Sequence, residues 1–356
     1  MSLEHILDQP LTSWMEKPGP DNDILLSSRI RLARNIGPMP FPNRATDAQM
    51  LEVTEIIQRS VGDLNKESQG SFLFLNLEKI SPLERFVLVE KHLISPNHAQ
   101  EARNRGLLIR EDGTVSIMVN EEDHLRIQCI LPGNQLAEAW ELANQVDDVL
   151  ETKIDFAFTE RHGYLTSCPT NVGTGLRASV MLHLPALVIT NQIRRILSAI
   201  SQLGLAVRGL YGEGTEAIGN IYQISNQITL GFSELEIIDN LHGVAGQIIE
   251  QERLARERLV EQNKDQLTDR VFRAFGILSY ARIISSQEAM QMLSDVRLGV
   301  DLHIIKHLEP KVFNELLVKT RPNFLQKLAH RSLDAIGRDI MRAEIIREQL
   351  GNNKEM

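Results

Sequence analysis

The stretch from Tyr164 to His183 constrains the fold most, because it joins a loop of reactive and flexible residues to a regular strand. In its second half hydrophobic residues alternate with polar ones, and this period of two is typical of a strand with one buried face. In its first half Pro169 restrains Cys168 to an extended or turn conformation, while Gly173 and Gly175 let the backbone approach a ligand closely. Such a loop can aim a thiol; a buried structural cysteine is the alternative interpretation.

The composition indicates a chain with enough apolar material for roughly two domains. It has 356 residues, of which 42% are hydrophobic, and a formal net charge of -9. The acidic excess argues against a general nucleic-acid binder, because the phosphate backbone requires a basic surface. Cys129 and Cys168 are too few for a disulfide framework and lack metal-ligand spacing. No stretch is apolar enough to span a bilayer and the first residues lack a signal-peptide pattern, so we expect a cytoplasmic protein without a membrane contact.

Two arginines on one strand face are the first charged feature. Residues 24–32 alternate, so Arg29 and Arg31 share a face of the predicted strand. Two stacked guanidiniums repel each other unless an anion or carboxylates lie between them. This pair therefore indicates an anion site, with solvated charges on an edge strand as the alternative.

An acidic turn between two predicted strands is the second charged feature. Three successive carboxylates, residues 121–123, connect strands at 116–119 and 125–131, and Arg126 follows on a polar face. Such a turn is usually solvated. Beside a strand arginine, however, it could hold a cation next to an anion, as a guanidinium facing a phosphate requires.

Helical periodicity and the positions of glycines divide the rest of the chain into predicted helices and loops. Amphipathic helices are predicted at 46–64, 135–150 and 184–203. A glycine-rich loop opening with Arg208 could cradle phosphates, with a flexible hairpin as the alternative, since it matches neither the P-loop nor the Rossmann pattern. From Ser233 most of the sequence is helical, and near the end Arg338 and Arg342 share a helix face that would suit a phosphate or, alternatively, is only solvated.

Taken together, these segments resemble the phosphagen (guanidino) kinases, the family of creatine and arginine kinases. The matching segments occur in the family's order, at 26–31, 120–126, 168–178, 208–209 and 225–234. Arg29 lies too near the start for the all-helical N-terminal domain that closes over the small substrate in those enzymes, so we expect that domain to be absent. About a hundred residues that are predicted to be helical follow the last match. In both respects it is similar to the bacterial protein-arginine kinases of this family.

The resemblance implies an α+β fold, with an eight-stranded antiparallel sheet flanked by helices and an all-helical C-terminal domain. We expect an irregular lead-in at 1–23, a catalytic domain at 24–255, and a helical domain at 256–356 that carries a phosphoarginine-binding motif.

The resemblance also implies an ATP site in which five arginines surround the phosphates. The residues expected to line the nucleotide are Ser27, Ser28, Arg29, Ile30, Arg31, His92, Arg126, Arg177, Ala178, Ser179, Val180, Met181, Arg208, Gly209, Leu210, Tyr211, Gly212 and Glu213. Mg²⁺ is expected on the nucleotide, with no metal ligand from the protein. A ring of arginines suits phosphoryl transfer, which depends mainly on positioning and charge stabilisation. The individual roles of His92 and Glu213 stay open.

The acceptor side is assigned to two residues. An arginine guanidinium has a pKa above about 12 and is a poor nucleophile while protonated. Glu122 is expected to bind it, orient it in line with the γ-phosphate and accept its proton, and Cys168 to place a thiolate against the same group. Transfer is expected to be direct, without a cysteine intermediate.

Regulation and partners are implied by the resemblance as well. The family's Arg-Asp-x-x-Arg-Ala motif forms an allosteric phosphoarginine pocket, and it is matched by Arg338, Asp339, Ile340, Met341, Arg342 and Ala343. The expected function is ATP-dependent phosphorylation of arginine in proteins during stress. The expected partners are these substrates, a Clp-type AAA+ protease that degrades them, a heat-shock transcriptional repressor, an activator protein and a second copy of the chain. A small-molecule guanidino kinase and a non-catalytic phosphoarginine-binding adaptor are the alternatives.

Overall fold

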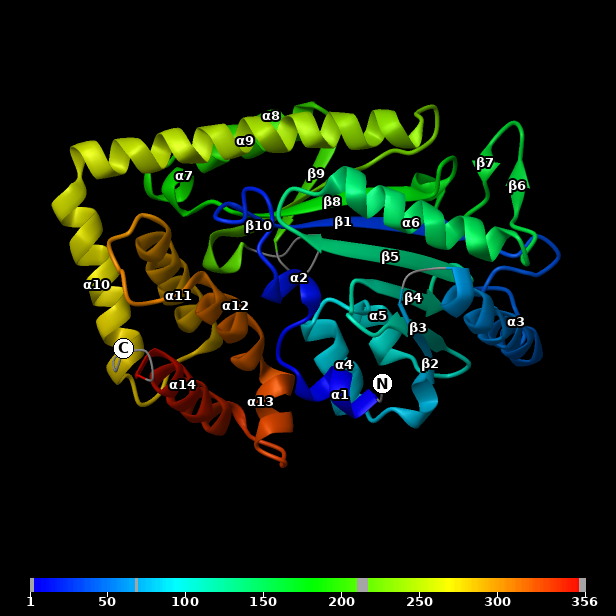
Figure 1. Ribbon diagram of the computed structural model, residues 1–356, viewed down its shortest axis with the longest axis horizontal. Coiled ribbons are helices and arrows are strands. Elements are labelled where there is room, and N and C mark those ends of the chain that lie inside the picture. Colours follow the sequence, from blue (N-terminus) through cyan, green and yellow to red (C-terminus); the bar gives the residue numbers. More distant parts are fainter. Residues whose placement is uncertain (1–2, 68–69, 210–216, 352–356) are drawn as a thin grey trace. The chain divides into compact units, whose positions relative to one another are not determined.

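The centre of the structure is one eight-stranded sheet. The computed structural model describes residues 3–67, 70–209 and 217–351, and within them the strand order is β2-β3-β4-β5-β1-β8-β10-β9 (Figure 1). The strands are β1 Leu25–Arg34, β2 Phe72–Asn76, β3 Gly106–Arg110, β4 Val115–Val119, β5 Leu125–Pro132, β8 Leu176–His183, β9 Leu205–Gly209 and β10 Ile221–Asn226. A separate hairpin pairs β6 Phe158–Thr159 with β7 Gly163–Tyr164. The predicted α+β fold with an antiparallel eight-stranded sheet is confirmed.

Helices make up most of the remainder. In the first two-thirds of the chain they are α1 Leu3–Asp8, α2 Ser13–Glu16, α3 Asp47–Glu67, α4 Pro82–Glu90, α5 Pro96–Gln100, α6 Leu136–Glu151, α7 Pro185–Ile189 and α8 Ile193–Gln202. In the last third they are α9 Glu234–Gln262, α10 Lys264–Tyr280, α11 Ser286–Asp301, α12 Pro310–Lys319, α13 Pro322–Leu328 and α14 Ala335–Gly351. The predicted helical character of the C-terminal part is therefore confirmed.

The chain forms two compact units that interleave along the sequence. The first unit comprises Met1–Pro20, Ser27–Val180 and Ser225–Gly243, and the second comprises Asp21–Leu26, Met181–Ile224 and Val244–Met356. The three predicted domain ranges stay a prediction. The two units are defined by compactness and cut through strands of the sheet, so they need not coincide with domains of separate evolutionary origin.

In the first unit, α3 and α6 pack against the sheet and against each other. The inward face of α6 carries Leu136, Ala139, Ala143, Val146 and Leu150, all nearly inaccessible to solvent and spaced as one helix stripe. Burial of a side chain the size of valine or leucine contributes about 1.5–3 kcal/mol. This stripe buries one face of the sheet in the core, and the arginines lie on the other face.

Two local predictions were wrong. The lead-in before residue 24 is not irregular throughout, since it contains α1 and α2, where Leu7 and Trp14 are buried. The single helix predicted for 184–203 is two helices, α7 and α8, separated at Asn191, whose φ is +57°. Asparagine tolerates this left-handed conformation, which ends a helix even where hydrophobic periodicity continues.

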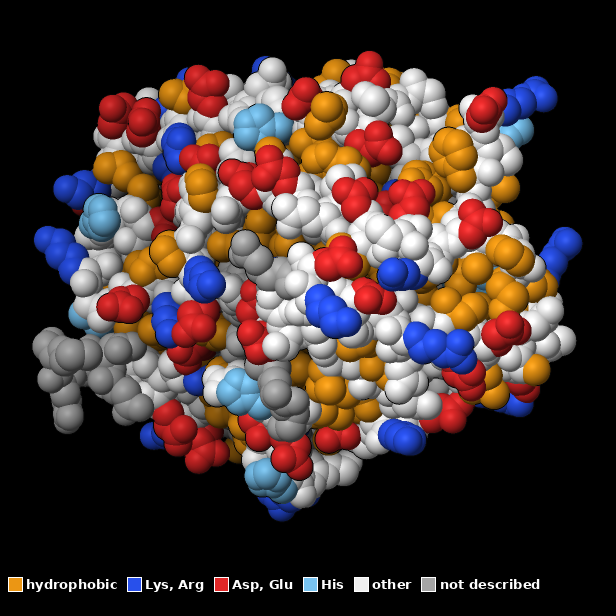
Figure 2. All heavy atoms as spheres, turned by 45° about the vertical axis from the view of Figure 1, so that its right-hand side comes forward, with side chains coloured by type: hydrophobic (Ala, Val, Ile, Leu, Met, Phe, Trp, Pro, Cys, Tyr) orange, Lys and Arg blue, Asp and Glu red, His pale blue; other side chains and the backbone are white. Residues whose placement is uncertain are grey.

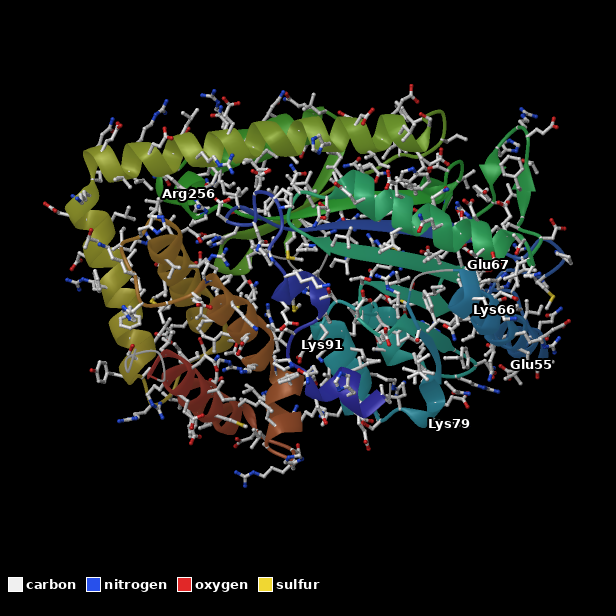
Figure 3. The ribbon with its side chains drawn as sticks, in the orientation of Figure 1. Glu55, Lys66, Glu67, Lys79, Lys91 and Arg256 are labelled. Carbon is white, nitrogen blue, oxygen red and sulfur yellow. The ribbon has the colours of Figure 1, made fainter. Side chains whose placement is uncertain are left out.

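A buried lysine anchors the lead-in within the first unit. Lys91 follows α4, is fully buried, and its Nζ donates hydrogen bonds to the carbonyl oxygens of Ile6 and Gln9 (Figure 3). The next residue, His92, has a φ of +61° and its ring meets the Trp14 ring edge-on, with 5.7 Å between centroids. The lead-in therefore contacts the side chains of both Lys91 and His92.

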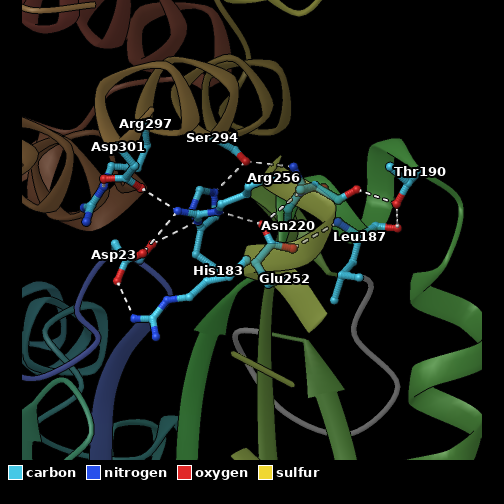
Figure 4. A network of polar contacts seen from close by, with 12 residues as sticks. Asp23, His183, Leu187, Thr190, Asn220, Glu252, Arg256, Ser294, Arg297 and Asp301 are labelled. Carbon is cyan, nitrogen blue, oxygen red and sulfur yellow. Dashed lines mark hydrogen bonds and ion pairs between the residues drawn. The ribbon is translucent and has the colours of Figure 1, made fainter. Parts of the chain in front are cut away.

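In the second unit, a buried ionic network joins α9, α11 and the segment before β1 (Figure 4). Arg256 Nε donates to Glu252 at 3.0 Å, and its Nη1 lies 3.4 Å from Asp23 and 3.6 Å from Asp301. Arg297 pairs with the same Asp301 at 2.8 Å. Glu252, which is fully buried, also accepts the two free N–H groups that begin α7.

The same network continues to the end of β8. His183 Nε2 lies 2.8 Å from Ser294 Oγ, which also accepts a hydrogen bond of 2.7 Å from Asn220 Nδ2. Burial and the charges of Arg256 and Arg297 lower the pKa of His183 well below its ordinary value. His183 is therefore a neutral part of the core rather than a titrating group.

Candidate functional site

Three strands of the first unit present arginines on one face of the sheet. Arg29 and Arg31 alternate on β1 as predicted, and the cross-strand pairing of Ala33 with Arg126 places Arg126 on that face. Arg29 Nε donates to Ser179 Oγ of β8 at 3.2 Å, and alternation along β8 then puts Arg177 on the same face. The sheet thus brings four of the five predicted arginines together.

The arginines are close enough to perturb one another. Burial, followed by the charges of Arg29, Arg126 and Arg177, lowers the pKa of Arg31 well below its ordinary value, while Glu121 acts in the opposite direction. Four guanidiniums gathered on a partly buried surface repel each other unless carboxylates or a bound anion lie between them. The cluster is suited to a polyphosphate, whose several negative charges would relieve that repulsion.

Glu121 holds the edge of this cluster. Arg126 Nη1 donates to Glu121 Oε2 at 2.6 Å, and Ser95 Oγ donates to the same carboxylate. Burial alone would raise the pKa of Glu121, but Arg126 and the Ser95 hydrogen bond outweigh it and lower the pKa. The sequence did not single out this carboxylate, although its position five residues before Arg126 was visible.

Other predicted nucleotide residues lie on or beside β1 and β8. Ser28 and Ile30 turn to the helix-covered face, where Ser28 Oγ donates to the Gly133 carbonyl at 2.8 Å and Ile30 is fully buried. Ser27 lies two residues before Arg29 on β1 and therefore on the same face of the sheet. On β8, the side chains of Ala178, Val180 and Met181 are buried. Any contact of Ser28, Ile30 or Ala178 with a nucleotide would therefore involve the backbone.

The fifth arginine belongs to the second unit. Arg208 and Gly209 end β9, and the loop after them was predicted to line the nucleotide. Leu210, Tyr211, Gly212 and Glu213 lie outside the described residues. His92 lies in the first unit, where Gln128 Nε2 donates a hydrogen bond of 2.8 Å to its carbonyl oxygen.

Glu122 is the most exposed carboxylate of the acidic turn. Its Oε2 lies 3.8 Å from Arg126 Nη2, and its side chain is 41% exposed, against 2% for Glu121. Burial raises the pKa of Glu122, the charges of Asp123 and Glu121 add to the effect, and those of Arg126 and Arg177 oppose it. A partly exposed carboxylate with a raised pKa beside an anion site has the properties of a general base.

A hydrogen bond joins the acidic turn to the Cys168 loop. Asp123 Oδ1 accepts from the backbone N–H of Ser167 at 2.7 Å and from Asn35 Nδ2 at 2.6 Å. Cys168 is partly exposed, and its Sγ lies 3.0 Å from Thr170 Oγ1. The segments that carry Glu122 and Cys168 are thus held against each other. By contrast, Cys129 is fully buried, and burial raises the pKa of its thiol to about 12.

Gly175 has a structural role that the sequence did not predict. Its φ is +65°, and a Cβ there would lie 2.6 Å from the carbonyl oxygen of Ala33. It therefore brings the loop against β1 rather than against a ligand. Beside it Arg34, which is 1% exposed, pairs with Asp147 at 2.7 Å and donates to the Thr174 carbonyl at 3.0 Å.

The C-terminal arginine motif lies on α14 with unequal exposure. Arg342 is buried and donates to the carbonyl oxygens of Thr320 and Ile284, at 2.9 Å each, and to Asp339. Burial lowers its pKa, although Asp339 acts in the opposite direction. Arg338 is partly exposed and donates to the Leu333 carbonyl at 2.8 Å.

The motif residues between and after the two arginines lie in the same helix. Ile340 is 47% exposed, Met341 is partly exposed and Ala343 is buried. Arg342 therefore lies within a framework of carbonyl oxygens, while Arg338 is the more accessible cation of the pair.

Neither a metal centre nor a membrane segment is found in the described part of the chain. In those residues, no three His, Cys, Asp or Glu side chains are grouped so that they could hold a metal ion. Of the helices that are described, none is long and apolar enough to cross a membrane. On the face shown in Figure 2, acidic and basic side chains are interspersed.

Comparisons with known proteins define the class. The family described as ATP:guanido phosphotransferase, C-terminal catalytic domain, matches residues 52–255, and the family described as protein-arginine kinase McsB C-terminal domain matches 264–356. A lombricine kinase structure has a TM-score of 0.57 at 25% identity, covering 70% of this chain and 75% of that one. The duplicated taurocyamine kinase of Schistosoma mansoni has a TM-score of 0.58 at 27% identity, covering 72% and 38%. The fold is that of the guanidino kinases of the phosphagen type.

Full-length relatives narrow the assignment. Protein-arginine kinases of Brevibacillus brevis and Bacillus subtilis are each 55% identical over 350 residues, covering 98% of this chain and 98% and 96% of theirs. The chain belongs to the protein-arginine kinase family and is an enzyme. Membership of this kinase family implies that it uses ATP.

Proposed function

We propose that this enzyme transfers the γ-phosphoryl group of ATP to arginine side chains of proteins at the arginine-bearing face of the sheet. The observation that carries the proposal is the hydrogen bond between Asp123 and Ser167, which fixes the Glu122 turn and the Cys168 loop beside each other. An acceptor site next to an anion site is the arrangement that in-line phosphoryl transfer requires.

In this mechanism the arginines hold the donor and the acidic turn prepares the acceptor. Arg29, Arg31, Arg126 and Arg177 would bind the phosphates, and Mg²⁺, bound to the nucleotide, would supply further charge neutralisation. Glu122 would orient the guanidinium and take its proton, which makes a nitrogen lone pair available for attack. Cys168 would contact the same guanidinium without forming a phosphorylated intermediate.

The substrate class is tested with an unstructured protein. Incubated with Mg-ATP, the enzyme should phosphorylate its arginines, and a version of the protein with lysine at every arginine should stay unmodified. The product should be located by mass spectrometry at neutral pH, because acid cleaves the N–P bond. Comparable turnover of free arginine would instead indicate a small-molecule guanidino kinase, and binding of phosphoarginine without any transfer would indicate an adaptor.

The cellular part of the proposal rests on the resemblance alone. We infer that the enzyme works in the cytoplasm, where ATP is available, that it marks proteins for a Clp-type AAA+ protease under stress, that it regulates a heat-shock repressor, and that an activator protein assists it. A reconstituted degradation assay tests the marking: a phosphorylated substrate should be degraded by such a protease and the lysine version should not.

A homodimer is part of the same proposal. Large apolar side chains on α10 and α14 are exposed, among them Tyr280 at 70% and Ile336 at 62%. Exposed apolar surface of this kind marks interaction sites. Sedimentation of the wild type and of Tyr280→Glu tests it; a wild type that stays monomeric at micromolar concentration would refute the dimer.

Phosphoarginine is expected to regulate the enzyme through Arg338 and Arg342. A charge-assisted contact to phosphate is worth roughly 1.5–3 kcal/mol, enough to bias a two-state arrangement about tenfold or more. Activity at low enzyme concentration should rise with added phosphoarginine and stay flat in Arg338→Ala. Arg342→Ala should also be flat, but it removes a buried side chain and so needs a stability check.

The matched control for this regulation is Arg273→Ala on α10, because Arg273 is exposed and forms its ion pair with Asp269 on the same helix. It should respond like the wild type. If Arg338→Ala responds equally well, the motif is only a partly solvated helix face.

A further inference from the structure

Helix α4 ends at a histidine whose backbone conformation favours glycine. His92 has a φ of +61°. Its N–H donates to the Val89 carbonyl oxygen at 2.9 Å, and the N–H of Leu93 donates to the Leu88 carbonyl oxygen at 3.0 Å. These two hydrogen bonds define a Schellman motif, in which glycine usually occupies the left-handed position. The backbone gains nothing from a side chain there, which indicates that the imidazole ring itself is used.

The same histidine lies over the arginine-bearing face of the sheet. Gln128 is the cross-strand partner of Arg31 in the pairing of β1 with β5, so these two side chains point to the same face. From that face Gln128 Nε2 donates to the His92 carbonyl oxygen at 2.8 Å and to Ser116 Oγ at 3.1 Å. The His92 backbone is therefore held on the side of the sheet that carries Arg31.

Trp14 of α2 contacts the His92 ring from the lead-in. The two rings meet edge to face, with 5.7 Å between centroids and 70° between planes, which is a favourable geometry for an aromatic pair. Trp14 is 5% exposed, whereas His92 is partly exposed. The imidazole therefore contacts a buried indole and still reaches solvent, where a ligand can meet it.

The position of Trp14 is set by contacts on both sides of it in the lead-in. Before Trp14, the carbonyl oxygen of Ile6 accepts a hydrogen bond from Lys91 Nζ (Figure 3). After Trp14, Gly19 lies so close to the end of β5 that a Cβ there would be 2.3 Å from the Pro132 carbonyl oxygen. The lead-in therefore holds the indole in one place, as a fixed contact for the ring beside it.

We propose that Trp14 is a positioning residue for the nucleotide, which fixes the His92 ring in the orientation in which that ring contacts ATP. The inference rests on the donor half of the proposed function, the binding of ATP at the arginine-bearing face. Trp14 is buried and acts through His92. A ring that is already held loses less conformational freedom when ATP binds, so ATP binds more tightly while the transfer step is unchanged.

The first test compares Trp14→Leu with Trp14→Phe. Leucine removes the aromatic partner, so KM for ATP should rise about threefold to tenfold, the range that a pair of aromatic rings contributes. The value of kcat at saturating ATP should stay within about twofold of the wild type. Phenylalanine keeps an aromatic ring and should restore most of the affinity. Circular dichroism checks that both variants are folded, because each alters a buried side chain.

His92→Gly tests the inference without a change in the core. Glycine suits the left-handed backbone, so this variant should fold as well as the wild type and lose affinity for ATP at least as strongly as Trp14→Leu. The matched control is His303→Gly at the end of α11. His303 has a φ of +57° and the same pattern of two hydrogen bonds around it, but its side chain is exposed. Its KM for ATP should stay that of the wild type.

The double variant shows whether Trp14 acts through His92. Once the imidazole is absent, Trp14→Leu should cause no further rise in KM for ATP, whereas two independent contributions would multiply.

Fluorescence supplies a reading that a merely structural role would not change. Trp14 and Trp140 are the two tryptophans of the chain, so in Trp140→Phe the emission reports on Trp14 alone. ATP should change this emission, because it contacts the ring that the indole touches, and the midpoint should equal the calorimetric Kd. The change should be absent when His92→Gly is added.

The outcomes separate the positioning role from the enzyme's proposed function. The role is overturned if folded His92→Gly or Trp14→Leu binds ATP like the wild type, if His303→Gly weakens ATP binding equally, or if the two effects multiply. Phosphorylation of arginine by the wild type then leaves the proposed function standing. If ATP affinity depends on Trp14 as described but the wild type phosphorylates no arginine in a protein, the proposed function fails and the positioning role stands.

Discussion

Replacing Glu122 with glutamine should lower kcat by about 10²- to 10⁴-fold, the usual contribution of a general base, and should leave ATP binding nearly unchanged. The reason is geometric, since Arg126 lies 2.6 Å from Glu121 but 3.8 Å from Glu122, so the arginine that would bind phosphate keeps its main partner. Initial rates on an arginine-bearing protein, quenched at neutral pH, measure the first effect. Calorimetric titration with ATP measures the second.

Variants of the proposed phosphate-binding arginines and of Cys168 are compared with the Glu122 variant. Arg126→Ala and Arg177→Ala remove cations from the proposed phosphate site and should weaken ATP binding about tenfold or more each, while Cys168→Ser should reduce turnover more than ATP affinity. If the Glu122 variant loses ATP affinity to the same degree as the Arg126 variant, the assignment of Glu122 to the acceptor is wrong.

The pH dependence of turnover supplies an independent check on Glu122. A general base acts only when ionised, so the rate should fall as the pH drops through the pKa of this carboxyl. Burial and the neighbouring carboxylates raise that pKa, so the acidic limb should lie above the range of an ordinary glutamate. The limb should disappear in Glu122→Gln, whose residual activity has no such group to titrate.

The arginine face of the sheet could be predicted from the sequence, because alternation along a strand is a local property. Arg29 and Arg31 share a face by parity alone. The register that adds Arg126 to them depends on which strand lies next to β1, and β5 is about a hundred residues away in sequence. The resemblance to a known family implied that these arginines surround the same phosphates, but the neighbouring strand is known only from the structure.

The pocket of about 650 Å³ that Glu122 helps to line could not be predicted in the same way. Its wall combines the start of α3 with residues 101–105 and 120–122, and no periodic pattern connects these segments. Ion pairs such as Asp47–Arg103 depend on side chains that meet through tertiary packing. The sequence indicated Glu122 but not the side chains that surround it.

The C-terminal motif illustrates a related limit. Helical spacing correctly placed Arg338 and Arg342 in one helix, α14, four residues apart. It could not indicate that Arg342 would be buried against the carbonyl oxygens of Thr320 and Ile284. Periodicity predicts the face of a helix, whereas the partner on that face is decided by the other helices of the unit.

Replacing Glu252 with alanine should destabilise the protein by about 3–5 kcal/mol, the usual effect of removing one partner of a buried ion pair. The carboxylate is fully buried and accepts hydrogen bonds of 3.0 Å from the N–H groups of Ala186 and Leu187 and from Arg256 Nε. Without it, the first turn of α7 has two unsatisfied N–H groups, and Arg256 Nε loses its acceptor. Arg256 then keeps the Asp23 carbonyl oxygen at 3.0 Å and longer contacts to the carboxylates of Asp23 and Asp301. Denaturant unfolding monitored by circular dichroism measures the loss.

Two further variants show whether the effect belongs to the network. Glu252→Gln keeps one oxygen acceptor and a similar volume, so it should destabilise less than alanine because it loses the charge but satisfies part of the N–H groups. Glu257→Ala changes an exposed residue of the same helix and should stay within about 0.5 kcal/mol of the wild type. If Glu252→Ala is as stable as Glu257→Ala, the carboxylate does not hold α7 to α9, and the ion pairs of Arg256 with Asp23 and Asp301 must be sufficient to keep that guanidinium buried.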